Sequence, residues 1–319
     1  MSDNRPAPAR RRQRLPKAWL SGSAIAAALS LLAAGVTEPA RAVPETGIPM
    51  ERTPSGHLLL PVTIGEAGPF AFILDTGASH TAIAAPVAES LGFRSQLAET
   101  GDVQALTTRF LAERFALNDF VVARQSPVDL VSVIIPVDPD SPVPVAGLVG
   151  ADAIAAPRYA MDFAQATLTL DAPPVQRIDG RIDPVGLLVA EAGMLRANRP
   201  VRVMIDSGSS RTIVNQALRH RLADQHMRLH TMVGGVDGRL QEEAGLVQIR
   251  RFRLGGLCVS GLQVLQSDLD IFRHMGWQDE PAMVIGMDVL QFTRIAVDRD
   301  TGTVQIDAAV DEFDCETAG

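Results

Sequence analysis

The chain has 319 residues, of which 46% are hydrophobic and 21% charged, the composition of a globular protein rather than a disordered one. Its formal net charge is −8, and only 4% of its residues are aromatic. Nucleic acids require a basic surface, and single strands also require stacked rings, so this composition argues against a nucleic-acid partner. The 2 cysteines are too few for a four-cysteine zinc site.

Residues 1–42 have the pattern of an export signal. Arginines cluster within residues 10–14, an apolar, alanine-rich run extends from Ala18 to Gly35, and Ala40-Arg41-Ala42 fits the pattern before a signal-peptidase cut. The sequence therefore predicts a cleaved signal peptide and a periplasmic or secreted protein. The alternative is an uncleaved membrane anchor facing the periplasm, and only then is membrane contact expected.

Export would also permit a disulfide bond. The two cysteines are Cys258 and Cys315, and an oxidising compartment allows a bridge between them that would hold the C-terminal tail. Two unrelated thiols are the alternative, and the sequence does not choose between them.

Beyond residue 42, short β-branched runs separated by Gly and Pro predict a mainly β protein. The expected strands are Leu58–Ile64, Phe70–Leu74, Phe120–Val122, Thr167–Leu170, Val201–Ile205, Leu246–Leu254 and Thr303–Ile306. Helical pattern is scarce and is expected in two matching places, Pro86–Leu91 and Asn215–Met227.

The chain contains an internal repeat, which indicates two similar lobes. Pro69–Ser79 resembles Pro200–Ser210, because each has a proline, then an apolar run, then Asp-Thr/Ser-Gly-x-Ser. Leu148–Asp152 resembles Val284–Asp288 in the same way, each being two apolar residues followed by Gly-x-Asp. Paired prolines at 173–174 interrupt strand and helix, so we divide the chain into an N-terminal lobe at 43–172 and a C-terminal lobe at 173–319.

The repeated Asp motifs point to acid–base chemistry. A strand that ends in Asp-Thr-Gly turns sharply at Gly and presents its carboxylate with a fixed orientation. If Asp75 and Asp206 face each other, they cannot both ionise cheaply and hold one proton between them. The ionised member can then deprotonate a water while the protonated member polarises a peptide carbonyl.

The neighbouring residues are expected to support these carboxylates. Thr76 and Ser207 place a hydroxyl beside each Asp, and Ser79 and Ser210 are expected to donate to the carboxylates. The candidate supporting residues are Thr76, Gly77, Ser79, Ser207, Gly208 and Ser210.

These residues resemble the pepsin-like and retropepsin-like aspartic peptidases, whose signature is hydrophobic-hydrophobic-Asp-Thr/Ser-Gly-x-Ser followed by hydrophobic-hydrophobic-Gly. The resemblance covers nearly the whole chain after residue 42. It implies an all-β, bilobal pepsin-like fold made of two retropepsin-like barrel lobes related by pseudo-twofold symmetry, as in some bacterial exported proteases. It also implies that Asp75 and Asp206 are catalytic and that the hydroxyls of Thr76 and Ser207 cross-link the two loops.

The resemblance further implies β-hairpin flaps that hold an extended peptide. The flap tips are expected near Gly101 and Asp102 and near Gly234 and Gly235. The sequence departs from pepsins in having a single tyrosine, Tyr159, far from either flap segment. This departure, with the small number of cysteines, favours two fused retropepsin-type lobes.

The function expected from these patterns is an exported aspartic endopeptidase that acts on polypeptide without a metal or other cofactor. Because one chain carries both Asp motifs, a monomer is expected. The alternative is a non-catalytic bilobal protein, a chaperone or assembly factor, that binds peptides in the same groove. Asp152, Asp162, Asp288 and Asp298, which also recur, are expected to hold turns, and the histidines at 220, 226 and 230 to be solvated rather than to bind metal.

Overall fold

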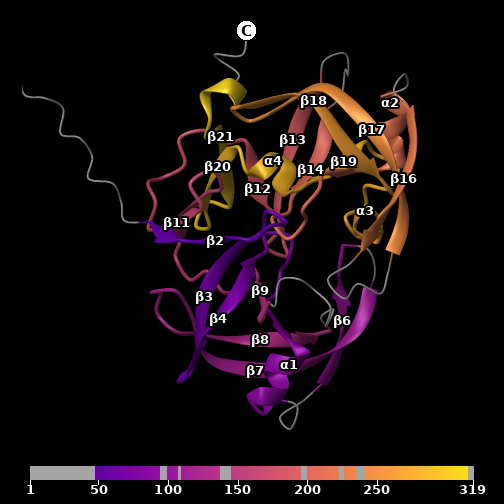
Figure 1. Ribbon diagram of the computed structural model, residues 1–319. Coiled ribbons are helices and arrows are strands. Elements are labelled where there is room, and N and C mark those ends of the chain that lie inside the picture. Colours follow the sequence, from indigo (N-terminus) through magenta and orange to yellow (C-terminus); the bar gives the residue numbers. More distant parts are fainter. Residues whose placement is uncertain are drawn as a thin grey trace, which may run out of the picture. The chain divides into compact units, whose positions relative to one another are not determined.

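The computed structural model describes residues 47–93, 99–106, 109–136, 145–194, 200–222, 226–234 and 241–314. Within these ranges the chain is mostly β-strand, with four short α-helices and one 3-10 helix (Figure 1). None of the helices in these ranges is long and apolar enough to cross a membrane.

Six strands close into a first barrel, in the order β3-β4-β9-β5-β8-β7. The barrel closes because β7 returns to β3, where Val122 pairs with Val62. The bounds of its strands are β3 Leu58–Ile64, β4 Ala67–Leu74, β5 Ala82–Ala84, β7 Arg109–Val122, β8 Val128–Ile135 and β9 Gly147–Val149. Two further strands extend this sheet, β2 (Glu51–Arg52) and β6 (Glu99–Gln104).

A second barrel repeats this order strand by strand, as β13-β14-β19-β15-β18-β17. Its closure is the pairing of Gly193 in β13 with Arg253 in β17. The bounds are β13 Leu188–Met194, β14 Val201–Ile205, β15 Ile213–Val214, β17 Gln241–Leu254, β18 Leu257–Gln266 and β19 Ala282–Ile285. The strands that correspond to β2 and β6 are β12 (Gly180–Ile182) and β16 (His226–Gly234). The predicted all-β fold of two retropepsin-like lobes is therefore confirmed.

The remaining strands join the two halves of the sequence in one sheet. They are β1 Ile48–Pro49, β10 Arg158–Asp162, β11 Thr167–Leu170, β20 Thr293–Asp298 and β21 Thr303–Ala308, in the order β1-β11-β10-β20-β21. At its centre β10 and β20 run antiparallel, with Ala160 opposite Ala296. Strands β10 and β11, which lie within the predicted N-terminal lobe, thus share a sheet with strands of the second half.

Side-chain alternation explains why these segments are strands. In β3 the side chains of Leu58, Leu60 and Val62 are fully buried, whereas Pro61 between them is exposed. Phe72 of β4 packs edge-on against Phe120 of β7, with ring centroids 5.6 Å apart. A period-two pattern of this kind buries one face of each strand in the barrel interior.

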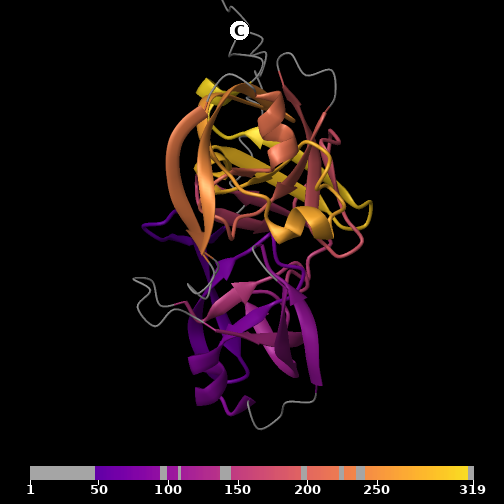
Figure 2. The same ribbon diagram turned by 90° about the vertical axis from the view of Figure 1, so that its right-hand side faces the viewer.

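The helices of the described residues are short. They are α1 Ala85–Ser90, α2 Gln216–Arg221, α3 Asp270–His274, α4 Met287–Leu290 and the 3-10 helix η2 Asp311–Phe313. Helices α1 and α2 follow equivalent strands, and each lies against its own barrel (Figure 2). The predicted helix Asn215–Met227 was too long, because the residues from His226 onward pair with β17 as strand β16.

Cys258, at the start of β18, is disulfide-bonded. The other cysteine of the sequence, Cys315, lies outside the described residues. The last described residue, Asp314, forms a bridge with Leu257, which brings the C-terminal segment to the start of β18.

Candidate active site

Each Asp motif begins where a buried strand ends beside a parallel neighbour. Asp75 follows the last residue of β4, and its N–H donates to the Val149 carbonyl at 3.0 Å. Asp206 follows the last residue of β14, and its N–H donates to the Ile285 carbonyl, also at 3.0 Å. The apolar-apolar-Gly segments therefore run alongside the Asp strands and fix the point at which each Asp leaves its sheet.

The backbone of each motif orients its own carboxylate. The Gly77 N–H donates to Oδ1 of Asp75 at 2.9 Å, and the Gly208 N–H donates to Oδ1 of Asp206 at 2.8 Å. Asp75 is 9% exposed and Asp206 is 5% exposed. The two carboxyl groups are thus buried and held in equivalent orientations.

The two carboxyl groups meet at the junction of the barrels, where each shifts the pKa of the other. Each also lies against the glycine of the opposite motif. A Cβ added at Gly77 would lie 2.5 Å from Cγ of Asp206, and one at Gly208 would lie 2.5 Å from Cγ of Asp75. Only glycine lets the two loops approach this closely.

A reciprocal set of hydrogen bonds joins the two loops behind the carboxyl groups. The Thr76 N–H donates to Oγ of Ser207, and the Ser207 N–H donates to Oγ1 of Thr76, both at 3.0 Å. The Thr76 hydroxyl donates to the Ile205 carbonyl at 2.9 Å, and the Ser207 hydroxyl donates to the Leu74 carbonyl at 2.7 Å. Both hydroxyl side chains are buried, so the predicted cross-link consists of four buried bonds.

Burial raises the pKa of both acids. For Asp75 burial is the largest cause, and it is opposed by the hydrogen bonds from Asp206 and the Gly77 N–H and by the charge of His57. Burial raises the pKa of Asp206 well above its ordinary value, and the charge of Asp75 raises it further. Two such groups retain one proton in common, because ionising both would place two negative charges side by side.

The two serines behave differently from the prediction. The Ser79 oxygen pairs with Nδ1 of His80 at 2.8 Å and does not reach Asp75. Ser210 is exposed, and among the described residues its hydroxyl has no hydrogen-bond partner. The carboxylates accept hydrogen bonds from the backbone N–H groups of Gly77 and Gly208 instead of from these serine hydroxyls. The tight turn of each motif directs these N–H groups at the carboxylates.

Two threonines at equivalent positions, Thr81 and Thr212, connect each Asp loop to the segment after the apolar-apolar-Gly strand. The N–H and hydroxyl of Thr81 both donate to Oδ1 of Asp152, at 2.9 and 2.7 Å, and the Gly150 N–H donates to the same hydroxyl at 3.1 Å. Thr212 and Asp288 form the same arrangement in the second barrel. The expected turn-holding role of the recurring aspartates agrees with these contacts, whereas the sequence analysis missed the threonines. Their matching positions after each Asp motif were the available signal.

The first hairpin does not turn where the sequence analysis placed its tip. Gly101 and Asp102 lie within β6 and pair with Ala112 and Leu111 of β7. Since β6 ends at Gln104 and β7 begins at Arg109, the turn lies farther along the chain. A Cβ at Gly101 would collide with the side chain of Arg114, so this glycine makes room for a cross-strand neighbour.

In the second hairpin, Gly234 is the last residue of β16 and pairs with Gln241 of β17. Gly235 lies outside the described residues.

The first hairpin reaches the second half of the chain. The Gln104 side chain donates to Oδ2 of Asp270 at 3.2 Å, and the Ile271 N–H donates to the Leu106 carbonyl at 3.3 Å. Both partners belong to α3, so this helix is the element on which the end of β6 rests.

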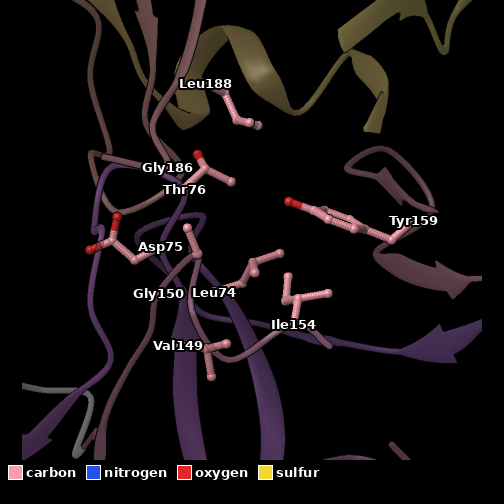
Figure 3. Close-up of a pocket in the computed structure, with 10 residues that line it drawn as sticks. Leu74, Asp75, Thr76, Val149, Gly150, Ile154, Tyr159, Gly186 and Leu188 are labelled. Atoms are coloured by element: carbon pink, nitrogen blue, oxygen red, sulfur yellow. The ribbon is translucent and has the colours of Figure 1, made fainter. Parts of the chain in front are cut away.

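A small cavity of about 10 Å³ lies behind Asp75, close to the space that one water needs. Figure 3 shows Tyr159 with its hydroxyl directed into this cavity and the Asp75 carboxylate directed away from it. Burial raises the pKa of Tyr159 to about 12. The only tyrosine of the sequence is therefore a neutral group behind the site rather than part of a flap.

His57 is a neighbour of the two acids that the sequence analysis missed. It precedes β3, and its Nε2 lies 3.1 Å from the Gly208 carbonyl oxygen of the opposite motif. A search for repeated residues does not reveal it, because the corresponding residue of the second half is Leu187.

Comparison with known proteins agrees with this geometry. The aspartyl protease family matches residues 60–153 and 193–289, which include both Asp motifs and both apolar-apolar-Gly segments. No curated protein matches the chain. The family match covers more than half of the sequence and falls once on each barrel. The chain therefore belongs to the aspartyl protease family and contains two copies of its retropepsin-like barrel.

Proposed function

We propose that the protein is an exported aspartic endopeptidase that hydrolyses peptide bonds in extended polypeptide segments. The observation that carries the proposal is the pair of buried carboxyl groups of Asp75 and Asp206, one from each barrel, each lying against the glycine of the opposite motif. Structural roles rarely require two acids whose pKa values are both raised by burial at one junction, whereas acid–base catalysis does.

The reaction follows from a shared proton. The ionised carboxylate removes a proton from a water molecule, whose oxygen attacks the carbonyl carbon of the peptide. The protonated carboxyl group gives its proton to the carbonyl oxygen as the new C–O bond forms. Transfer of a proton to the amide nitrogen then allows the C–N bond to break, which releases an acid and an amine. General acid–base catalysis of this kind contributes about 10²–10⁴ in rate.

Two further features belong to the proposal. The leader-like residues 1–42 and the disulfide-bonded Cys258 support export, since structural disulfides persist in oxidising compartments. Mass spectrometry of the exported protein should then find Val43 at its N-terminus. Both acids belong to one chain, which supports a monomer, and light scattering coupled to size exclusion should give the mass of a single chain.

The catalytic proposal is tested with Asp75→Asn and Asp206→Asn, assayed on an unfolded protein substrate over a range of pH. Each substitution removes one acid but keeps the size of the side chain, so we expect cleavage to be lost and the circular dichroism spectrum to be retained. The matched control is Asp129→Asn, because Asp129 is an exposed residue of β8 whose carboxylate accepts a hydrogen bond from the Asp119 N–H and takes no part in the site.

Retained cleavage in both dyad variants would contradict the proposal. A wild-type protein that binds peptides without cleaving them would instead favour the alternative of a peptide-binding chaperone or assembly factor.

A further inference from the structure

The two halves of the chain repeat a turn that precedes the first strand of each barrel, 53–57 and 183–187. In both turns the N–H of the first residue donates to the carbonyl of the fifth residue at 2.9 Å. The fifth residue is His57 in the first half and Leu187 in the second half. The pseudo-symmetric halves therefore differ in chemistry at this position, where a titratable side chain corresponds to an apolar one.

His57 connects its own turn to the opposite Asp motif. Its Nε2 lies 3.1 Å from the Gly208 carbonyl oxygen, and since a carbonyl only accepts, Nε2 carries a proton and donates. On the other side of the ring, Nδ1 lies 2.9 Å from Oγ of Ser55, which in turn lies 2.9 Å from Oγ1 of Thr53.

This hydroxyl pair suits both charge states of the ring. Neutral His57 accepts a hydrogen bond at Nδ1 from the Ser55 hydroxyl. Protonated His57 donates at Nδ1 to Ser55, whose own proton can turn toward Thr53. The ring can therefore gain or lose a proton without breaking its bond to Gly208, because a hydroxyl serves as either donor or acceptor.

The Gly208 backbone in turn touches both acids. Its N–H donates to Oδ1 of Asp206, and its Cα lies so close to the Asp75 carboxyl group that a Cβ would collide with it. The backbone of one residue, Gly208, therefore separates His57 from the dyad.

Asp75 and His57 act on each other electrostatically. Among the described residues, Asp75 is the charged group that acts on His57, and it favours the protonated ring, whereas burial lowers the pKa of His57. The charge of His57 acts in return on Asp75, whose pKa it lowers.

We propose, on the basis of the aspartic protease function above, that His57 is a positioning residue that makes Asp75 the ionised member of the dyad and leaves the shared proton on Asp206. It does so by fixing the Gly208 peptide through Nε2 and, when protonated, by placing a positive charge beside Asp75. Leu187 offers neither a donor nor a charge at the corresponding position, so the proton assignment follows from this single difference between the halves.

The first test is the pH profile of kcat/KM for His57→Gln and His57→Leu. Glutamine keeps an N–H donor for the Gly208 carbonyl but cannot carry a charge. We expect its acid limb to move to higher pH by about one unit, because Asp75 loses an opposite charge, while the basic limb moves less, since His57 is neutral there. Leucine removes the donor too and should also lower kcat at the optimum.

The control is His220→Gln, an exposed histidine on α2, which should leave both limbs unchanged. An acid limb of His57→Gln that coincides with that of the wild type would overturn the proposal. If the residue were only structural, the variants would lose thermal stability without a shift in the profile.

A second measurement separates this proposal from the proposed function. The pKa of His57 is followed by NMR of the ring protons in the wild type, Asp75→Asn and Asp206→Asn, with the signal assigned by its absence in His57→Gln. Asp75→Asn should lower the pKa of His57, whereas Asp206→Asn should leave it unchanged or raise it. If the two variants shifted the pKa of His57 equally, the proposed preference of His57 for Asp75 would be refuted even in an active enzyme. The predicted difference between the variants would support that preference even if no substrate were cleaved.

Discussion

The hydrogen bonds between Thr76 and Ser207 give the sharpest prediction about what holds the halves together. In Ser207→Ala, the oxygen that accepts from the Thr76 N–H and donates to the Leu74 carbonyl disappears. Both partners are buried. Leaving a buried polar group unsatisfied costs about 1–3 kcal/mol, so we expect the free energy of unfolding to fall by about 2–4 kcal/mol.

The assay is urea unfolding followed by circular dichroism. Thr76→Val should cost a similar amount, because it removes the hydroxyl that accepts from the Ser207 N–H and donates to the Ile205 carbonyl. Each control exchanges one residue for its counterpart in the other half: Thr76→Ser and Ser207→Thr keep the hydroxyl and should lose much less. A loss below about 0.5 kcal/mol in Ser207→Ala would refute the reasoning, since it would mean that water or a shifted backbone satisfies the exposed groups.

Two further predictions concern the carboxyl groups themselves. Gly77→Ala places a methyl group 2.5 Å from Cγ of Asp206, so it should lower kcat by about 100-fold or more, as expected for a displacement of reacting groups. The control is Gly193→Ala, where a Cβ would meet nothing within 4 Å. A Gly77→Ala enzyme with wild-type kcat would contradict the close approach of Gly77 to Asp206. Because burial holds the pKa of Asp206 well above 3.8, the folded protein binds this proton more tightly than the unfolded chain, and this contribution to stability declines as pH rises from 3.8 through the raised value. Asp206→Asn should therefore have a higher Tm than the wild type at pH 7 and a similar Tm below pH 3.8. Thermal unfolding at several pH values measures this difference, and a lower Tm of Asp206→Asn at pH 7 would show that burial is not the dominant cause of the raised pKa.

The sequence was sufficient to predict the fold and the meeting of the two Asp motifs because both depend on local patterns that occur twice. A turn after a buried strand requires Asp-Thr/Ser-Gly at fixed spacing, and its second occurrence distinguishes it from an ordinary turn. A short apolar, β-branched run bounded by glycines also located strand β3 at Leu58–Ile64. These features are readable because neighbours in the chain determine them.

Other features depended on pairing between distant strands. A glycine signals a turn when considered alone, but Gly101 lies within a strand because β6 pairs with β7 and Arg114 packs over it. The predicted helix after Asn215 is shortened for a similar reason, since pairing with β17 draws the residues from His226 into β16. Tertiary contacts of this kind override local propensity.

By itself, the sequence determined the fold, a duplicated barrel with a duplicated Asp motif, and it predicted that Asp75 and Asp206 carry the proposed chemistry. Only the tertiary structure decided what surrounds those residues. His57 bonds to a carbonyl 151 positions away, and Ser79 bonds to its neighbour His80 rather than to Asp75. The physical reason is that a motif specifies the conformation of its own few residues, whereas the partner of a side chain depends on which distant segment folding brings within about 3 Å.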